Sequence, residues 1–150
     1  MGKPIESEIS QSSFRNERHK AVVNLIYTYG FVSGRLQEII GAEGLTMQQF
    51  NILRILRGRH PEPCTNSHIK SRMLDKNSDV TRIVDRLIRN EMAERCSSKE
   101  DRRKVEITIT DKGLSALSRL DDQNRIMDDI VSGLSNDEVE MLNALLDKIR

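Results

Sequence analysis

Hydrophobic residues recur at steps of three and four along most of this chain, the spacing that places them on one face of a helix. The first stretch carries Gly30 and Gly34, each of which disfavours a helix by about 1 kcal/mol relative to alanine. Close packing of another helix, or else a kink, is the expected reason for them. Six helices are predicted: from Glu17 to about Ile40, from Thr46 to Gly58, from Thr65 or Asn66 to Leu74, over residues 77–90, from Thr110 through Ile130, and from Ser135 to the C-terminus.

Between residues 90 and 111 the period changes from that of a helix to that of a strand. Val105, Ile107 and Ile109 alternate strictly with polar residues, which predicts a strand over residues 104–110. Residues 92–95 are its predicted partner, and the charged segment CSSKEDRR joins the two strands as a hairpin. The fold class predicted for the chain is therefore mainly α, with one small β-hairpin.

A short helix is followed by a more basic helix, with a connection of about three residues near Asp75 and Lys76. Asn77 or Ser78 is the expected N-cap of the second helix, with Asp79 near its positive end. Two such helices followed directly by a two-stranded hairpin are the arrangement of a winged helix-turn-helix, in which the second helix enters the major groove of DNA.

The net charge of +1 conceals an uneven distribution. Residues 45–112 carry fifteen basic and ten acidic side chains, whereas residues 1–44 carry five of each and residues 113–150 carry four basic and eight acidic ones. A basic centre between a neutral and an acidic segment is typical of a DNA-binding unit flanked by assembly helices.

The composition, with 31% charged and 37% hydrophobic residues, is that of a soluble, helix-rich protein of one domain. The first twenty residues contain no apolar segment of a secretion signal, so we expect a cytoplasmic protein. Cys64 and Cys96 have no zinc-ligand spacing, and the three histidines are scattered. No catalytic triad, phosphate-binding loop or acidic metal cluster is visible, so we expect no enzyme activity, no cofactor and no bound metal.

Three motifs follow one another in the centre of the chain: SDVTRIVDRLIRNEMAER, DRRKVEITIT and TDKG. Together they resemble the recognition helix, the wing and the start of the next helix in the MarR family of transcriptional regulators. The resemblance runs from about residue 17 onward. It implies that residues 1–150 form one domain. It implies a homodimer built from helices in about 17–44 and 111–150, and a winged helix-turn-helix lobe in about 45–110.

The polar face of helix 77–90 contains the residues predicted to contact DNA: Asn77, Ser78, Asp79, Thr81, Arg82 and Arg86. Arg82 is the candidate for a bidentate contact to guanine, and Thr81 for a phosphate or a thymine methyl group. Arg86 is placed for a phosphate, and Asp85 is expected to orient Arg82 or Arg86. The alternative is a solvated helix face held by salt bridges.

The hairpin carries a second cationic group, Lys99, Arg102, Arg103 and Lys104, suited to a narrow minor groove. By the family resemblance, Arg103 enters the groove and Asp101 holds it in place. The alternative is a solvated loop tip.

The sequence departs from the family pattern at the end of the predicted recognition helix. Glu91 replaces the usual glycine, so Asn90 is expected to take the left-handed conformation that ends a helix.

Members of this family respond to phenolic compounds, metals or oxidants. The residues that could line an aromatic pocket closed by one cation are Tyr27, Tyr29, Phe31, Phe50 and Arg35, which would suit a small aromatic carboxylate. The alternative is that these side chains fill the core. Nothing marks Cys64 or Cys96 as a reactive thiol, so we interpret both as incidental.

The predicted function is a sequence-specific DNA-binding transcriptional regulator, a repressor released by a small-molecule or other signal. Its predicted partners are a second copy of the chain and double-stranded DNA with a pseudo-palindromic site. The alternative is a winged-helix module that binds protein rather than DNA.

Overall fold

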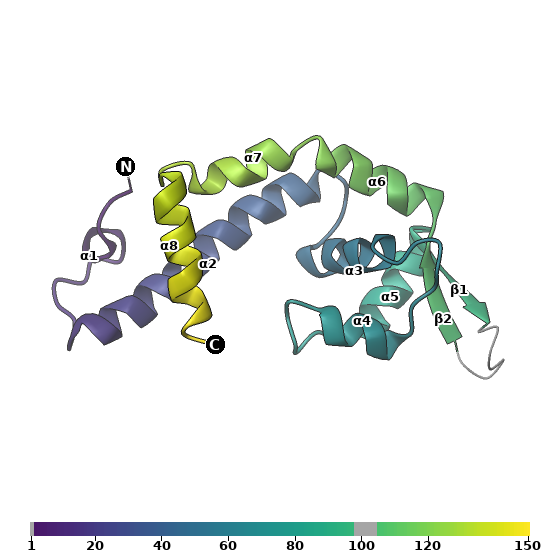
Figure 1. Cartoon of the computed structure of the whole chain (residues 1–150), viewed down its shortest axis with the longest axis horizontal. Coiled ribbons are helices and arrows are strands. Elements are labelled where there is room, and N and C mark those ends of the chain that lie inside the picture. Colours follow the sequence, from purple (N-terminus) through teal and green to yellow (C-terminus); the bar gives the residue numbers. More distant parts are fainter. Residues whose placement is uncertain (1, 98–104) are drawn as a thin grey trace. The chain divides into compact units, whose positions relative to one another are not determined.

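A computed structural model describes residues 2–97 and 105–150 of the chain (Figure 1). Its helices and strands are α1 (Ile5–Glu8), α2 (Glu17–Gly41), α3 (Met47–Arg57), α4 (Asn66–Arg72), α5 (Val80–Arg89), β1 (Ala93–Ser97), β2 (Val105–Ile109), α6 (Asp111–Asp121), α7 (Asn124–Asp128), the 3-10 helix η1 (Asp129–Val131) and α8 (Asn136–Asp147). The mainly helical fold with one antiparallel hairpin agrees with the prediction.

The chain divides into two compact units. One unit, which we call the central unit, comprises residues 37–123, and the other, the terminal unit, comprises residues 1–36 together with residues 124–150. Helix α2 crosses the boundary between them, and α6 belongs to the central unit.

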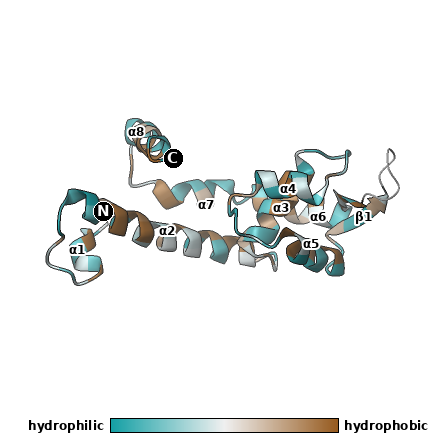
Figure 2. Cartoon of the chain, turned by 90° about the horizontal axis from the view of Figure 1, so that it is seen from below, coloured by the Kyte–Doolittle hydropathy of each residue, from teal (hydrophilic) through white to brown (hydrophobic). Residues whose placement is uncertain are grey.

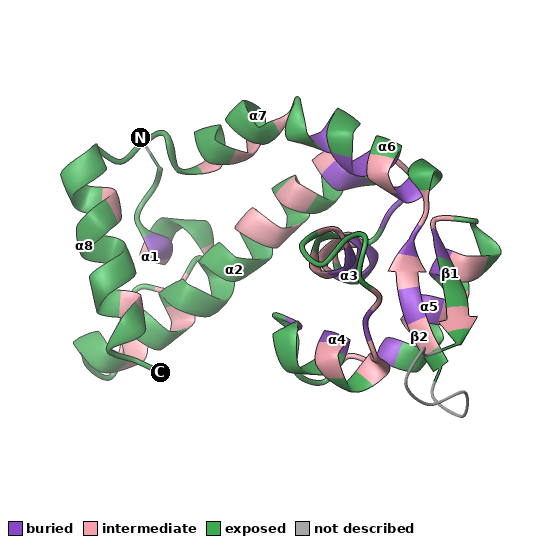
Figure 3. Ribbon diagram, turned by 45° about the vertical axis from the view of Figure 1, so that its right-hand side comes forward, coloured by how far each residue is buried: buried purple, intermediate pink, exposed green. Residues whose placement is uncertain are grey.

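The central unit has a continuous hydrophobic core around α3, which packs against α4, α5, α6 and β2. Figure 3 shows buried residues on α3, α6 and β2. The largest fully buried side chains are Ile40, Leu45, Ile52, Leu53, Leu56, Ile69, Met73, Val84, Leu87, Ile107, Leu117 and Leu120. All of them except Leu45 lie within the predicted helices and strand, where the spacing of hydrophobic residues determines which face turns inward.

Four helices, α3, α4, α6 and α8, each begin after a side chain that accepts a hydrogen bond from a backbone N–H in the first turn. Thr46 and Ser135 form capping boxes with Gln49 and Glu138. Thr65 caps α4 and Thr110 caps α6 by accepting hydrogen bonds from the backbone N–H of His68 and of Gly113.

Strands β1 and β2 pair antiparallel, with Ala93 opposite Ile109 and Ser97 opposite Val105. Cys64 extends this sheet as an isolated bridge, because its N–H and C=O each form a 2.8 Å hydrogen bond with the backbone of Ile107. The Cys64 side chain is buried.

The predicted helix over residues 110–130 is interrupted. Helix α6 ends at Asp121, and α7 begins only at Asn124. Asp121 and Asp122 place two carboxylates at the C-terminal end of α6, where the helix dipole disfavours negative charge. Asp121 is held there by the guanidinium of Arg57.

Helix α1 in the terminal unit has no counterpart in the prediction, because four residues are too few to show a period. It is joined to α2 by an ion pair of 2.6 Å between Glu6 and Lys20. The Tyr27 hydroxyl also donates a 2.8 Å hydrogen bond to Glu8. Ile5 is buried, so α1 is packed within the terminal unit.

Many large hydrophobic side chains of the terminal unit remain exposed. Figure 2 shows hydrophobic stretches along α2, and Figure 3 shows α8 largely exposed. The exposed residues of α2 and α8 are Val22, Leu25, Ile26, Tyr27, Tyr29, Phe31, Met141, Leu142 and Leu145. A Cβ at Gly30 or Gly34 would meet nothing within 4 Å, so no described residue of the terminal unit packs against these glycines. Within residues 2–97 and 105–150, no helix has the length and apolarity needed to cross a membrane.

Candidate nucleic-acid interface

The turn between α4 and α5 runs from Met73 to Asp79 and is longer than the three residues predicted. The Asp75 carboxylate organises it by accepting hydrogen bonds from the Asn77 backbone N–H and the Ser78 hydroxyl, each at 3.0 Å. These local bonds compete with helix formation. Asn77 and Ser78 therefore lie in the turn, and the prediction that one of them caps α5 is wrong.

Asp79 is the N-cap of α5. Its Oδ1 accepts a hydrogen bond of 3.2 Å from the backbone N–H of Arg82. The predicted DNA contact of Asp79 is untested, but this carboxylate already stabilises the beginning of the helix and adds a negative charge where the helix dipole is positive.

Helix α5 separates its apolar and basic residues cleanly. Val80, Val84 and Leu87 are buried. On the other side lie the exposed residues Thr81, Arg82, Arg86 and Arg89. Steps of four and three place the three arginines in one row, as expected for a helix that presents cations to a polyanion.

Asp85 contacts neither of the arginines that it was predicted to orient. Its carboxylate forms an ion pair with the guanidinium of Arg95 on β1. The expectation that it orients Arg82 or Arg86 is wrong, because the adjoining strand brings a cation from ten residues away within reach of the same carboxylate.

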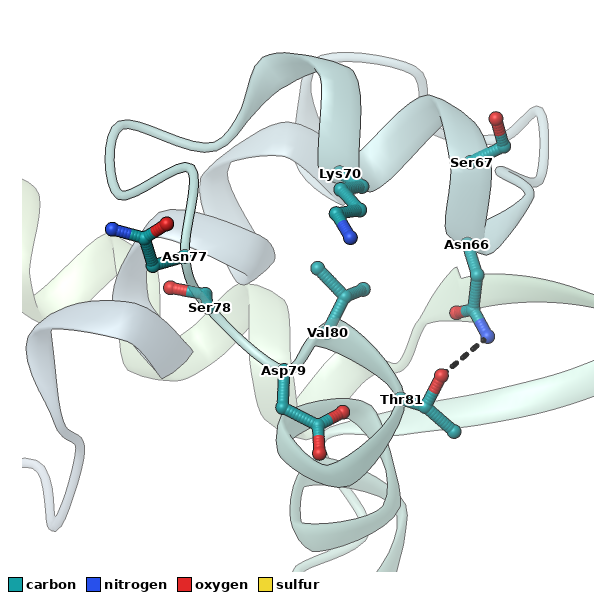
Figure 4. A pocket seen from close by; sticks show the side chains of 8 residues that line it. All are labelled: Asn66, Ser67, Lys70, Asn77, Ser78, Asp79, Val80 and Thr81. Atoms are coloured by element: carbon teal, nitrogen blue, oxygen red, sulfur yellow. Dashed lines mark hydrogen bonds between the residues drawn. The ribbon is translucent and has the colours of Figure 1, made fainter.

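A pocket of about 520 Å³ lies between α4 and the start of α5 (Figure 4). It is lined by Asn66, Ser67, Lys70, Asn77, Ser78, Asp79, Val80 and Thr81. In Figure 4 the Lys70 side chain extends toward this space, and Asn66 Nδ2 donates to Thr81 Oγ1 at 3.5 Å. The structure thus brings together the predicted residues 77–79 and Thr81.

The α4 residues of this pocket, Asn66, Ser67 and Lys70, were missed by the sequence analysis. Their spacing was a usable signal, because Lys70 follows Asn66 by four residues and Ser67 by three, and both steps keep side chains on one helix face. In a helix-turn-helix the first helix crosses the DNA backbone, and such polar residues are suited to that crossing.

The wing residues Lys99, Asp101, Arg102, Arg103 and Lys104 lie outside the residues that the structure describes. The described strands lead to them from both sides, with Ser97 paired to Val105 at the end of the ladder. Their predicted roles stay predictions.

The left-handed residue after α5 is Glu91, with φ of 59°, and not Asn90 as predicted. Asn90 keeps a negative φ and ends the helix. The Glu91 carbonyl accepts a 2.7 Å hydrogen bond from the Thr110 hydroxyl, and its carboxylate pairs with Lys112. Glu91 therefore adopts the left-handed backbone conformation that a glycine would favour at this position.

The surroundings of Gly113 explain why the TDKG motif has a glycine at this position. A Cβ at this position would lie 2.4 Å from the Met92 carbonyl oxygen and 2.7 Å from Ile109 Cγ1. The first turn of α6 is therefore packed directly against the base of the hairpin, and only glycine fits there.

The two thiols favour the protonated form. Burial raises the pKa of Cys64, with Arg59 opposing and Glu106 reinforcing the shift. Burial and the carboxylates of Glu106 and Glu94 raise the pKa of Cys96. Among the described residues, no three histidine, cysteine or acidic side chains are grouped so as to hold a metal ion.

The residues predicted to line a ligand pocket belong to both units. Tyr27, Tyr29 and Phe31 are exposed on α2, together with Arg35. Phe50 belongs to the central unit, where the Arg54 guanidinium lies 5.7 Å from its ring centroid. The pocket itself remains a prediction.

A short helix, a turn, a basic helix and an antiparallel hairpin define the central unit as a winged helix-turn-helix. The model of the MarR family matches residues 45–105. The HTH-type transcriptional regulator PecS of Dickeya dadantii is 30% identical over 152 residues, covering 95% of this chain and 91% of PecS. The chain belongs to the MarR family and is a transcriptional regulator.

Solved structures agree in fold. A mutant MarR of E. coli in complex with operator DNA superposes with a TM-score of 0.80 at 23% identity, covering 92% of this chain and 99% of that protein. BpsR of Bordetella bronchiseptica, whose DNA binding is regulated by 6-hydroxynicotinic acid, has a TM-score of 0.74 at 22% identity, covering 87% of this chain and 98% of that one.

Proposed function

We propose that this regulator is a homodimer that binds a pseudo-palindromic operator, with α5 in the major groove, and that it represses transcription until a signal releases it. The observation that carries the proposal is the exposed row of Arg82, Arg86 and Arg89 on α5, behind a helix start capped by Asp79. A helix-turn-helix directs the first residues of its second helix toward base edges.

Each part of the interface has a separate task in this proposal. Arg82 reads a guanine and Thr81 contacts a base or a phosphate, while Arg86 binds the DNA backbone. The pocket beside Lys70 receives a backbone phosphate where α4 crosses the strand. The wing cations from Lys99 to Lys104 enter the neighbouring minor groove. The operator complex of the E. coli relative supports the general mode of binding.

The second copy is proposed to cover the terminal helices. Large hydrophobic side chains of α2 and α8 are exposed in one chain, and a soluble monomer rarely leaves so large an apolar surface uncovered. Gly30 and Gly34 are open to solvent and would allow a partner helix to approach closely.

The signal is proposed to be a small aromatic carboxylate held by Tyr27, Tyr29, Phe31, Arg35 and Phe50. The regulation of BpsR by 6-hydroxynicotinic acid supports a ligand of this chemical class. The protein is inferred to act in the cytoplasm and to catalyse no reaction.

The deciding experiment selects DNA from a random pool with the purified full-length chain, then measures binding of the selected site across a salt series. Inverted half-sites about one helical turn apart and a steep loss of affinity with salt are expected. Sedimentation should give a dimer at micromolar concentration. A folded dimer that binds no DNA would instead identify a protein-interaction module, and a monomer would contradict the proposed assembly.

A further inference from the structure

The ion pair between Asp85 and Arg95 joins two elements that the proposed function assigns to different grooves of DNA. Asp85 lies in the second turn of α5, and Arg95 lies at the middle of β1. The contact links Asp85 Oδ1 to a terminal nitrogen of the Arg95 guanidinium.

Arg95 lies on the inner side of the hairpin, at the edge of the core. It is two residues after the buried Ala93, so both side chains point to the same face of the strand. Ala93 fills the base of the hairpin, whereas Arg95 pairs with Ile107 in the ladder, closer to the open end. The ion pair therefore joins the hairpin to α5 at the register of Ile107, the last buried residue of the ladder, beyond which Val105 is exposed.

The pair is exposed enough that folding does not depend on it. The side chains of Asp85 and Arg95 are 40% and 53% exposed, and ion pairs at such exposure add little to the stability of a fold. Asp85 also has arginines at three neighbouring positions on its own helix, Arg82, Arg86 and Arg89. Among the described residues, none of these three side chains forms an ion pair with it.

We infer that Asp85 and Arg95 are positioning residues, which fix the direction of the hairpin relative to α5 so that the helix and the wing engage DNA together. The inference rests on the proposed function. This role explains why the acidic Asp85 lies on a helix face that otherwise presents cations. Its ion-pair partner, Arg95, belongs to the strand that leads to the wing.

Asp85→Asn gives a test in which the sign of the effect decides. Removing a negative charge from a DNA-binding face strengthens binding if electrostatics alone acts. Positioning predicts the opposite, a three- to tenfold weaker binding of the operator selected by the wild-type protein. The matched control is Glu94→Gln, which removes one negative charge from the residue next to Arg95 on the exposed side of β1 and should leave operator binding unchanged or tighter.

Two further measurements separate positioning from a general loss of structure. The charge-swapped variant Asp85→Arg/Arg95→Asp should recover most of the operator affinity that Asp85→Asn loses. Arg95→Gln alone breaks the same ion pair and should weaken operator binding as Asp85→Asn does. Hydroxyl-radical footprints of Asp85→Asn should lose protection at the flanks of the operator and keep it at the centre. Thermal unfolding should be nearly unchanged in every variant.

Tighter operator binding by Asp85→Asn, or no recovery in the charge-swapped variant, would overturn the inference while leaving the proposed function intact. Wild-type protein that binds no DNA would overturn both.

Discussion

The Asp79 carboxylate accepts a hydrogen bond from the backbone N–H of Arg82, so the residue that ends the turn caps the helix that carries the candidate base-reading arginine. The cap and the reading residue share one helical turn. The direction of Arg82 at the start of α5 therefore depends on a side chain that need not touch DNA.

The first prediction separates these two roles of Asp79. Asp79→Ala should destabilise the protein by about 1 kcal/mol, because a capping oxygen is lost, whereas Asp79→Asn should keep most of that stability. Asp79→Asn should also bind random DNA more tightly, since it removes a negative charge beside the pocket. Denaturant unfolding and DNA titration measure the two effects. Equal stability of the Ala and Asn variants would show that the cap contributes nothing.

The second prediction concerns base reading by Arg82. Arg82→Ala should cost about 1–3 kcal/mol on the operator and remove the preference at one position of each half-site, while binding to random DNA changes little. Binding of operator and random duplexes across a salt series measures this.

The matched variant is Arg86→Ala, one turn later on the same exposed row. It should weaken operator and random DNA together and reduce the salt slope by about one unit per protomer. If Arg82→Ala shows the same uniform loss, Arg82 only holds phosphate. The sequence is then read by Asn77, Ser78, Asp79 or Thr81.

The periodic pattern predicts the helices and most of the core, because burial of one face is what orders those segments. The caps at Thr65, Thr110 and Ser135 were also predictable, because each cap depends on a single hydroxyl residue directly before its helix. The length of the turn after α4 was not predictable, because it depends on which hydrogen-bond donors the Asp75 carboxylate binds.

The interface was predictable only where its residues share one element. Arg82 and Arg86 follow from the polar face of a single helix, whereas Lys70 joins the site only because α4 packs beside α5. The pairing of Asp85 with Arg95 depends on the angle between a helix and a strand. Sequence spacing carries no information about that angle.

The third prediction tests the close contact of α6 with the hairpin. Gly113→Ala should destabilise the protein by about 2–3 kcal/mol, because the added methyl group overlaps the Met92 carbonyl, which belongs to the backbone and cannot turn away. Gly133→Ala is the control, since a Cβ there meets nothing within 4 Å. Thermal unfolding of both variants checks the difference, and similar melting temperatures would contradict the assigned role of Gly113.

The fourth prediction concerns the left-handed residue after α5. Glu91→Gly should stabilise the protein by roughly 0.5–1 kcal/mol, because glycine adopts a positive φ without the steric cost that glutamate bears. The lost pair with Lys112 is exposed and offsets little of this gain. Glu91→Gln loses the same pair and keeps the strained backbone, so it should show no gain. A Gly variant no more stable than the Gln variant would argue that the position is not strained.

The last prediction is a dependence of stability on pH. The Glu43 carboxylate accepts hydrogen bonds from the Arg119 guanidinium at 2.7–3.0 Å, between the turn after α2 and helix α6. This contact lowers the pKa of Glu43 below its ordinary value. A carboxyl group with a lowered pKa in the folded state stabilises the protein above its unfolded pKa, and the contribution disappears as pH falls through the folded pKa. Wild type should therefore exceed Glu43→Gln in unfolding free energy at pH 7, and the difference should shrink below about pH 4.

Arg119→Gln should give the same dependence of unfolding free energy on pH, because it breaks the same pair. A wild-type advantage that stays constant between pH 7 and pH 3 would mean that the Glu43 side chain contributes through packing and not through its charge.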